Sequence, residues 1–329
     1  MKICFIDRTD FKYSYEDKLE SKLRGAETIL INLSENLHKL DNEVFVFNNS
    51  SIHYSSNNYT WTDISNLKKY NYEFDVAISN GDINLLNTVN AKKKFAISYS
   101  IQTIEKFIRK KQIFTYLKNK PKIILIGKYH KIKRSFLTRI FGYDFLDVSV
   151  DDIFNKTTLL EKIDNNKAIF TSRSDRNMDL LINIWKNKIY ESKDRYKLFV
   201  TPNENYNKIN KYNIFLRSMK NQNDLINDIQ TSRVMLVPGH KAELFCLAAE
   251  EARELCVPIV TLGIGSLVER VEHGKTGYIA RNIDEFAQYT LKIFNNNKIW
   301  EELRTNLFKL RGKLSWEKSS KKFLNTLKK

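Results

Sequence analysis

Short apolar runs alternate with stretches of helical periodicity along the whole chain. Runs bounded by polar residues or proline are typical of parallel strands that are covered on both faces. Apolar residues recur at helical spacing between them, most clearly in Ile29, Leu30, Leu33, Leu37 and Leu40. The runs predict strands at 2–6, 43–48, 75–79, 94–98 and 122–126, and again at 167–171, 197–201, 213–216, 234–237, 258–261 and 277–280. This alternation predicts an α/β protein with two doubly wound, Rossmann-like parallel-sheet domains.

A polar stretch over 151–167 separates the two sets of strands. We therefore expect a first domain over 1–150 and a second over 151–312. Residues 313–329 carry apolar side chains at helical spacing, and we expect them to form a closing helix that packs back on the first domain.

The composition is that of a globular protein. The chain has 329 residues, of which 42% are hydrophobic and 28% charged, enough for two cores. No apolar run is long enough to span a membrane, and Asp7 interrupts the N-terminal run too early for a signal peptide. The cysteines Cys4, Cys246 and Cys256 are scattered and form no zinc or disulfide pattern. These features predict a cytoplasmic protein.

The formal net charge of +17 is concentrated in one segment. Residues 103–140 hold twelve lysines and arginines against the single acid Glu105, which gives a local charge of +11. Apolar and aromatic residues interleave with these cations, which suits an anionic membrane face or a polyanionic glycan. Nucleic acid is a less favoured partner, and an ordinary solvated face over core positions is the plain alternative.

The chemistry is concentrated in the run Val237–Val260. This run predicts a strand, a polar turn, a helix that carries both Glu243 and Glu251, and a second strand. Eight residues on one helix correspond to about 12 Å of rise and about 80° of rotation, so the two carboxylates could contact two parts of one extended ligand but could not share a metal. Free N–H groups at the helix start would suit a diphosphate. The alternative is a surface helix whose glutamates lie in water.

The run and the residues after it resemble a known family. The spacing of Glu243 and Glu251, the Val257–Val260 strand, the Gly265–Val271 segment and the glycines Gly274 and Gly277 look like the signature of retaining GT-B glycosyltransferases of the "group 1", family 4 type. The resemblance is specific over 234–281. It implies two domains with an active site in the cleft between them and a nucleotide-diphosphate sugar as donor.

The resemblance also assigns roles to individual residues. It implies that Glu243 contacts the donor sugar, that Glu251 contacts the ribose, and that the amides of Phe245, Cys246 and Leu247 bind the diphosphate. The family usually has glycine where Cys246 stands. No metal or other cofactor is implied, and the absence of any Asp-x-Asp pair agrees with a metal-independent mechanism.

Two further positions in the second half concern the donor. Arg173 and Arg176 follow the strand predicted at 167–171, where ligands bind in open α/β sheets. The resemblance implies that this pair holds the donor phosphates and offsets charge on the leaving diphosphate; the alternative is two surface arginines on a loop. His240 precedes Glu243 and could reach the donor, although a lone loop histidine is more often a bystander.

The first half supplies weaker candidates. The Arg24–Glu27 segment resembles the family's opening of the first long helix, and Gly25 is expected near the donor phosphates. Ser98, Tyr99 and Ser100 follow a predicted strand and are expected on the acceptor side. Many relatives carry a histidine there, and this chain has none. His130 is expected to be a surface residue.

These observations predict a retaining, metal-independent glycosyltransferase. It would move a sugar from a nucleotide-diphosphate sugar to a glycan, a lipid-linked acceptor or a small acceptor, in the cytoplasm at the inner membrane face. The alternative is a non-catalytic polyanion- or membrane-binding protein on the same GT-B fold.

Overall fold

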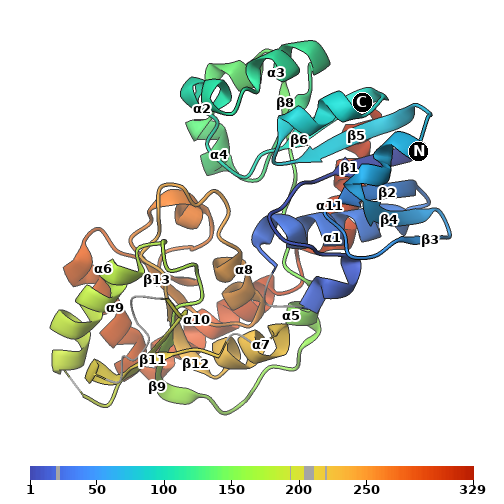
Figure 1. Cartoon of the computed structure of the whole chain (residues 1–329). Coiled ribbons are helices and arrows are strands. Elements are labelled where there is room, and N and C mark those ends of the chain that lie inside the picture. Colours follow the sequence, from blue (N-terminus) through green and yellow to red (C-terminus); the bar gives the residue numbers. More distant parts are fainter. Residues whose placement is uncertain (20–22, 193, 204–210, 219–220) are drawn as a thin grey trace. The chain divides into compact units, whose positions relative to one another are not determined.

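The computed structural model of the chain describes residues 1–19, 23–192, 194–203, 211–218 and 221–329. It divides into two compact units, each with its own sheet (Figure 1). The first unit comprises Met1–Ser149 together with Ser315–Lys329, and the second comprises Val150–Leu314.

The first unit is built on an eight-stranded sheet. Its strands are β1 (Lys2–Ile6), β2 (Glu43–Asn48), β3 (Tyr54–Ser56), β4 (Tyr59–Asp63), β5 (Phe74–Asn80), β6 (Ala91–Ile97), β7 (Lys122–Leu125) and β8 (Tyr143–Phe145). Their order in the sheet is β3-β4-β2-β1-β5-β6-β7-β8, and only the β3–β4 pair is antiparallel. Residues 3–6 of the central strand β1 are buried on both faces, which is why the sequence shows a continuous apolar run there.

Helices cover this sheet and connect its strands. They are η1 (Tyr15–Leu19), α1 (Gly25–His38), η2 (Ile64–Lys69), η3 (Ile83–Thr88), α2 (Ile104–Arg109), α3 (Ile113–Asn119), α4 (Lys128–Lys133), η4 (Phe136–Arg139) and the closing helix α11 (Trp316–Lys328). Helix α11 packs against α1 and buries Trp316, Phe323 and Leu327. Its C-terminal carbonyls accept hydrogen bonds from Lys93, 2.6 Å from the Lys328 oxygen.

The second unit has a six-stranded, all-parallel sheet. Its strands are β9 (Asp164–Ile169), β10 (Lys197–Val200), β11 (Ile214–Leu216), β12 (Ser232–Leu236), β13 (Ile259–Thr261) and β14 (Gly277–Ile279). They are arranged in the order β11-β10-β9-β12-β13-β14. Chain order therefore reverses beside β9, which makes the carboxyl ends of β9 and β12 the point where ligands bind in such sheets.

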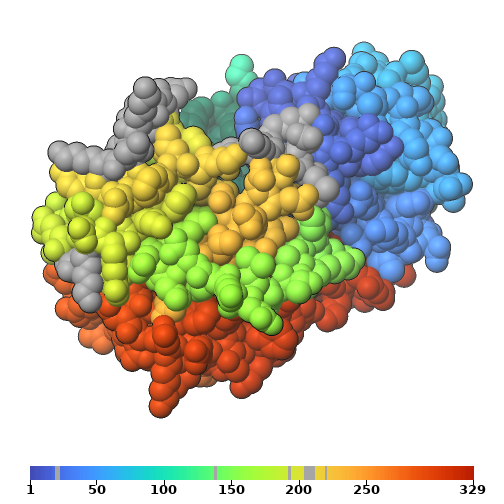
Figure 2. Space-filling model, turned by 90° about the horizontal axis from the view of Figure 1, so that it is seen from below, coloured from blue at the N-terminus to red at the C-terminus, as the bar shows by residue number. Residues whose placement is uncertain are grey.

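The helices of the second unit precede, connect and follow its strands in sequence. They are α5 (Asp152–Lys156), α6 (Met178–Ile184), the π-turn η5 (Trp185–Ile189), η6 (Tyr190–Ser192), η8 (Lys211–Asn213), α7 (Gln222–Gln230), α8 (Leu247–Glu254), η9 (Gly265–Glu269), α9 (Ile283–Asn295) and α10 (Asn297–Leu310). Figure 2 shows α10 in orange-red beside the green segment that begins this unit. Arg304 donates to the Leu160 carbonyl at 2.6 Å, which holds the two segments together.

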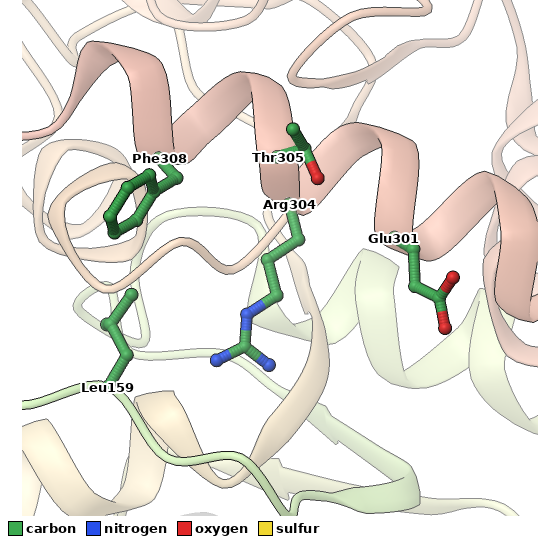
Figure 3. Close-up of a pocket in the computed structure, with 5 residues that line it drawn as sticks. All are labelled: Leu159, Glu301, Arg304, Thr305 and Phe308. Carbon is green, nitrogen blue, oxygen red and sulfur yellow. The ribbon is translucent and has the colours of Figure 1, made fainter.

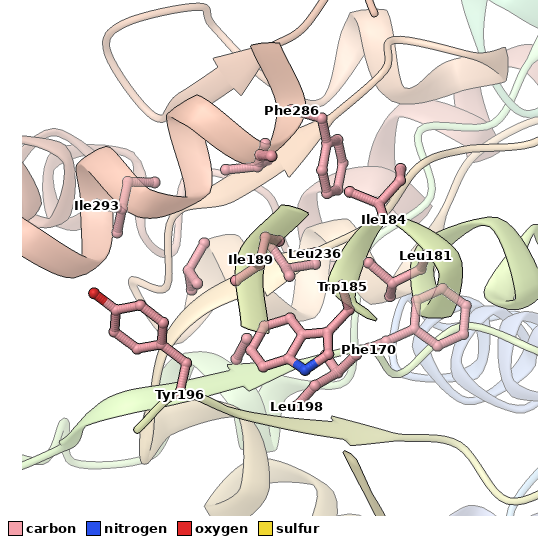
Figure 4. Close-up of a cluster of buried hydrophobic side chains, with 14 of the residues drawn as sticks. Phe170, Leu181, Ile184, Trp185, Ile189, Tyr196, Leu198, Leu236, Phe286 and Ile293 are labelled. Atoms are coloured by element: carbon pink, nitrogen blue, oxygen red, sulfur yellow. The ribbon is translucent and has the colours of Figure 1, made fainter. Parts of the chain in front are cut away.

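The core on one face of this sheet surrounds Trp185. Figure 4 shows its indole among aliphatic side chains from α6, α9 and the strands. The indole is fully buried, and its Nε1–H donates to the Tyr212 carbonyl at 2.9 Å. Nearby, the rings of Tyr196 and Phe294 stack at 4.2 Å. Large side chains thus fix α6 and α9, and with them the loops that begin at the strand ends.

The predicted strands are all present, and the prediction of two parallel-sheet α/β domains is confirmed. Strands β3, β4 and β8 were not predicted. β3 and β8 are three-residue edge strands, and the residues of β3 are exposed, so neither has an apolar run. In the described part of the chain, no helix has the length and apolar character required to cross a membrane.

Candidate functional site

Two loops meet at the carboxyl ends of β9 and β12 in the second unit. One runs from β9 to α6 and carries the predicted arginines; the other runs from β12 to α8 and carries Glu243. The strands are parallel neighbours, so their carboxyl ends lie side by side. The amide of Asn177, in a left-handed conformation, donates to the Gly239 carbonyl at 2.5 Å and ties the loops together. The two clusters that the sequence singles out therefore belong to one site.

Two glycines fix the course of the loop before Glu243. Gly239 and Gly265 have φ angles of +95° and +77°, which other residues rarely adopt. A Cβ on Gly265 would lie 2.3 Å from the His240 oxygen, and one on Gly239 would lie 2.5 Å from the Ile264 oxygen. This close approach lets the Ser266 N–H donate to the Glu243 carbonyl at 3.0 Å. The position of Glu243 thus depends on contacts that only glycine permits.

The prediction that one helix carries both glutamates is wrong. Helix α8 begins at Leu247, so Glu251 lies on it and Glu243 lies in the loop before it. The cause is Cys246, whose φ of 64° and ψ of 78° place it in the left-handed region. The chain turns there, and the helical geometry expected between the two carboxylates does not apply.

Glu243 combines burial with an unused acceptor atom. Its side chain is half-buried, and its Oε2 is buried with no hydrogen-bond partner among the described residues. Burial raises the pKa of Glu243, while the Cys246 thiol and the charge of Arg176 lower it. A buried acceptor without a partner costs about 1–3 kcal/mol, and a ligand hydroxyl that donates to it would recover this free energy.

Two arginines stand beside this carboxylate, in different surroundings. Both pair with Asp175: Arg173 Nη2 lies 2.8 Å and Arg176 Nη1 lies 3.5 Å from its Oδ2. The Arg173 side chain is 69% exposed, whereas that of Arg176 is 20% exposed and lies 3.4 Å from His240 Nδ1. Arg176 is thus the arginine held against the second loop, and Arg173 extends into solvent.

His240 is hydrogen-bonded to the backbone of its own loop. Its Nδ1 accepts a hydrogen bond from the Ala242 N–H at 3.2 Å, and its carbonyl accepts one from the Glu243 N–H at 2.9 Å. Arg176 approaches the same nitrogen. The histidine therefore links the arginine to the backbone that leads into Glu243.

The start of α8 presents a row of backbone donors. In the described part of the chain, no hydrogen bond is found from the N–H groups of Phe245, Cys246, Leu247 and Ala248. Leu247 and Ala248 open the helix, where the positive end of the helix dipole favours an anion. Burial, and next the charge of Glu243, raise the pKa of the Cys246 thiol well above its usual value. The side chain at the usual glycine position is therefore a small neutral thiol.

A cluster of buried ion pairs contacts the start of this helix through the Phe245 ring. Glu250 pairs with Arg253 at 2.6 Å and also with Arg270, whose guanidinium lies 4.2 Å from the centre of the Phe245 ring. Arg253 in turn pairs with buried Glu254 at 2.8 Å. Phe245 is therefore held by side chains that the sequence analysis left unassigned.

Glu251 lies in α8 near a second buried cation. Burial raises the pKa of Glu251 to about 7, and the Arg217 charge lowers it. Arg217 is buried directly after β11, where its Nε donates to Asp228 Oδ2 at 3.1 Å. Sequence analysis missed Arg217. The available signal was a cation immediately after an apolar run, at the carboxyl end of a parallel strand.

The candidates in the first unit lie at the carboxyl edge of its own sheet or at a helix start. Gly25 is the first residue of α1, where Glu27 accepts a hydrogen bond from the Arg24 N–H at 3.1 Å. Ser98, Tyr99 and Ser100 follow β6: Ser98 Oγ donates to the Ser100 carbonyl at 3.0 Å, and the Tyr99 hydroxyl donates to Asn80 at 2.7 Å. Lys106 donates to the Ser100 hydroxyl.

Two buried carboxyl groups in the same region were not predicted as site residues. Asp7, directly after β1, accepts a hydrogen bond from the Tyr13 hydroxyl at 2.5 Å. Burial raises the pKa of Asp7 and that of Glu27, and the charge of Asp7 raises the latter further. Their burial depends on long-range packing, which the sequence pattern does not show.

The prediction for His130 is wrong. The side chain is buried, not exposed, and burial lowers its pKa to about 4. It lies in α4, and its ring is hydrogen-bonded to the Ser100 backbone, which joins α4 to the loop after β6. A neutral histidine thus has a structural role beside the acceptor-side candidates.

We also searched the described residues for metal-binding clusters and for pockets near the site. The described residues include no group of three or more His, Cys, Asp or Glu side chains that could hold a metal ion. A pocket along α10, lined by Leu159, Glu301, Arg304, Thr305 and Phe308, shares no residue with the site (Figure 3).

Comparison with known families bears on the second unit. Residues 159–309 match the sequence profile of the family described as "Glycosyl transferases group 1". The second unit is a group 1 glycosyltransferase domain. The predicted resemblance to group 1 glycosyltransferases is thereby confirmed, and the match contains both loops of the site.

One curated relative gives a sequence match of limited extent. A "Probable sucrose-phosphate synthase" of Thermosipho melanesiensis is 29% identical over 117 residues. The match covers 35% of this chain and 27% of that protein, so the chain corresponds to about a quarter of the relative's length.

Solved structures match the whole chain. Anabaena HepE, solved in complex with UDP and glucose, has a TM-score of 0.72 at 12% identity, and the match covers 100% of this chain and 99% of that one. The sucrose-phosphate synthase of Thermosynechococcus elongatus has a TM-score of 0.70 at 11% identity over 99% of this chain and 98% of that one. At these identities the likeness shows the fold, which is the predicted GT-B fold.

Proposed function

We propose that this protein transfers a sugar from a nucleoside-diphosphate sugar to a glycan, a lipid-linked acceptor or a small acceptor. The observation that carries the proposal is the row of free N–H groups over 245–248, with the carboxylates of Glu243 and Glu251 on either side in sequence and Arg176 beside the first. The family match of 159–309 supports it. UDP is the proposed nucleotide, because HepE was solved with UDP and with UDP-glucose.

Each part of the donor has a proposed partner. The diphosphate lies on the N–H groups at the start of α8, where the helix dipole stabilises its charge. Glu251 accepts hydrogen bonds from the two ribose hydroxyls, for which it must be ionised. Oε2 of Glu243, which has no partner among the described residues, accepts hydrogen bonds from the sugar hydroxyls. Arg176 and the exposed Arg173 complete the anion site.

The proposed reaction breaks the bond between the anomeric carbon and the diphosphate oxygen. Negative charge develops on that oxygen, and Arg176 with the amides at 245–248 stabilises it, so no metal ion is needed. The acceptor oxygen bonds to the anomeric carbon on the face from which the diphosphate leaves, and its proton passes to a diphosphate oxygen. Configuration at the anomeric carbon is retained. We place the reaction in the cytoplasm, at the inner membrane face.

Calorimetric titration tests the donor site. We expect UDP and UDP-glucose to bind, and GDP and ADP to bind more weakly. Glu251→Ala should weaken UDP about 10- to 100-fold, since it removes two charge-assisted hydrogen bonds. Glu302→Ala, an exposed position on α10, is the matched control. Equal UDP affinity in the Glu251→Ala variant would refute the assignment of this site.

Sugar transfer itself is tested separately. Release of UDP in the presence of EDTA, with NMR of the anomeric proton in the product, checks metal independence and retention in one assay. If EDTA abolishes turnover and added Mg²⁺ restores it, metal independence is refuted. If the product has the inverted configuration at the anomeric carbon, retention is refuted.

A non-catalytic binding protein is the second candidate. The basic segment 103–140 favours it, since it carries much of the net charge and lies in the other unit. Binding of UDP with no hydrolysis or transfer for any acceptor, together with tight binding to polyanions that falls steeply with salt, would favour this candidate.

A further inference from the structure

Exposed apolar side chains are concentrated in one part of the first unit. Of the twelve large hydrophobic residues found exposed in the described chain, seven lie between residues 104 and 140. They are Ile104, Ile108, Phe114, Leu117, Ile132, Phe136 and Ile140. Phe114 is 87% exposed and Ile132 is 75% exposed, which is unusual for such side chains unless a partner covers them. We call these seven residues the apolar surface set.

The sheet topology brings these residues to one end of the unit. Helices α2 and α3 connect β6 to β7, and α4 and η4 connect β7 to β8. Strands β6, β7 and β8 are successive at the edge of the sheet. Figure 1 shows α2, α3 and α4 gathered beside these strands. Residues up to 36 positions apart in sequence therefore belong to one region of the surface.

The exposed side chains are not displaced core residues. The same helices bury other side chains: Phe107 from α2, Tyr116 from α3 and His130 from α4. The Phe107 and Tyr116 rings lie 5.4 Å apart, and Tyr116 lies 5.0 Å from the Phe141 ring. Each of these helices thus already buries a side chain in the unit. The exposed apolar residues lie on the other faces of the helices and do not contribute to the core.

Positive charge surrounds the apolar surface set. Nine lysines and arginines between 103 and 140 are exposed: Arg109, Lys110, Lys111, Lys118, Lys120, Lys128, Lys131, Lys133 and Arg139. Within the described residues, no salt bridge is found for Arg109, Lys110, Lys111, Lys131 or Lys133. Glu105 is the one acid in the segment. An anionic surface would neutralise charge that the protein itself leaves uncompensated.

We propose that the outer faces of α2, α3, α4 and η4 dock on an anionic lipid bilayer, with the apolar surface set entering the headgroup region. Aliphatic side chains flanked by cations suit this layer: the apolar groups reach the acyl boundary, and the cations stay with the phosphates. Five of the seven residues are isoleucine or leucine, which offer no ring for base stacking, so the set as a whole favours a bilayer over single-stranded nucleic acid. The proposal does not depend on the proposed transfer reaction.

Vesicle cosedimentation with the full chain tests this. The probes are vesicles of phosphatidylcholine alone and vesicles with phosphatidylglycerol as the major lipid, at low and at high salt. Each cation near an anionic surface raises affinity about fivefold, so we expect at least tenfold tighter binding to the anionic vesicles at low salt. Equal partition into both vesicle types would overturn the proposal.

Paired variants separate insertion from simple attraction of charge. Phe114→Ser with Ile132→Ser should lower affinity for anionic vesicles about tenfold, because two inserting groups are lost. The control is Phe308→Ser with Val268→Ser, which changes exposed apolar residues of the second unit. Lys110→Glu with Lys111→Glu should lower affinity at least as much, against Lys298→Glu with Lys309→Glu as control.

Three outcomes contradict the proposal. Equal losses in the test and control pairs would mean that net charge or general hydrophobicity drives binding. Unchanged binding in the Phe114 and Ile132 variant would mean that no insertion occurs. Tighter binding to single-stranded RNA than to anionic vesicles at the same salt concentration would assign the surface to nucleic acid. Circular dichroism confirms that each variant is folded, which is expected because all substituted positions are exposed.

Discussion

The carboxyl edges of the two sheets both carry polar side chains, but they use them differently. In the first unit these groups bond to one another, as Tyr99 does to Asn80 at 2.7 Å and Tyr13 to Asp7 at 2.5 Å. In the second unit, within the described residues, Oε2 of Glu243 and the N–H groups of 245–248 have no partner. In the second unit, the unpaired groups are held in place by the glycine contacts and the buried ionic cluster, and they form a preorganised ligand site. In the first unit, the polar groups bond to one another and stabilise the edge.

This contrast has an energetic consequence. Unpaired buried polar groups lower the stability of the second unit by about 1–3 kcal/mol each, and a bound ligand restores that free energy. The first edge also holds buried oxygens for which no hydrogen-bond partner is found among the described residues, at Asn48, Ser79 and Gln102. Asp7, Tyr13, Asn80 and Tyr99, however, are bonded in pairs there. We therefore expect substitutions at the two edges to differ in their main effect. In the second unit they should mainly lower ligand binding and activity, and in the first unit they should mainly lower the free energy of unfolding.

The largest expected effect concerns Arg176. Arg176→Ala removes the half-buried cation beside Glu243 and should lower kcat about 10²- to 10³-fold, because charge on the leaving diphosphate loses a partner. Arg173→Ala should cost less, since that side chain is 69% exposed and solvent screens its charge. Steady-state assays of both variants test this ranking. Arg281→Ala, at a side chain 90% exposed in the same unit, should leave kcat unchanged. A greater loss at Arg173 would contradict the ranking.

Gly265→Ala tests whether backbone contacts hold the second edge in shape. The new Cβ would lie 2.3 Å from the His240 oxygen, so the loop before Glu243 must move, and the free energy of unfolding should fall by about 2–4 kcal/mol. Gly274→Ala is the matched control. Its φ of +76° is similar, but nothing lies within 4 Å of the added Cβ, so it should cost about 1 kcal/mol. Thermal unfolding followed by calorimetry measures both. Equal losses would mean that backbone strain, not the close approach, determines the effect.

Glu251→Gln should stabilise the unliganded protein and weaken nucleotide binding. The pKa of this carboxyl is raised to about 7, from about 4.3 in an unfolded chain. Its ionisation therefore costs folding free energy that is fully present above pH 7 and disappears below about pH 4.3. The neutral variant should be more stable than the parent by about 1–3 kcal/mol at pH 8, and the difference should vanish near pH 4.

Unfolding in urea across that pH range, with UDP titration at pH 8, measures both effects of the Glu251→Gln change. Glu302→Gln should alter neither quantity. A variant that is both less stable at pH 8 and equal in UDP affinity would contradict the role of Glu251, and with it the view that the second edge is held ready for a ligand at the expense of stability.

The sequence predicted those features that depend on local pattern. The continuous apolar runs predicted the central strands, because parallel strands buried on both faces need such runs. The arginines after β9 were likewise visible, whereas the helix was expected to include Glu243 and begins only at Leu247. The path through Cys246 was not visible: a left-handed conformation at a residue other than glycine is determined by packing. Burial of His130 and Arg217 also depends on contacts between elements distant in sequence, which hydrophobic periodicity does not encode.

The smallest expected effect is at the first edge. Tyr99→Phe removes the hydroxyl that donates to Asn80, so the free energy of unfolding should fall by about 0.5–1.5 kcal/mol, with UDP affinity unchanged. Tyr54→Phe is the control, since that ring lies on an exposed edge strand and its loss of a hydroxyl should have no effect on unfolding. Urea unfolding and UDP titration of both variants distinguish the two kinds of edge. If Tyr99→Phe instead weakened UDP binding without changing stability, the first edge would be a nucleotide-binding surface too, and the difference between the units would lie in which part of the donor each holds.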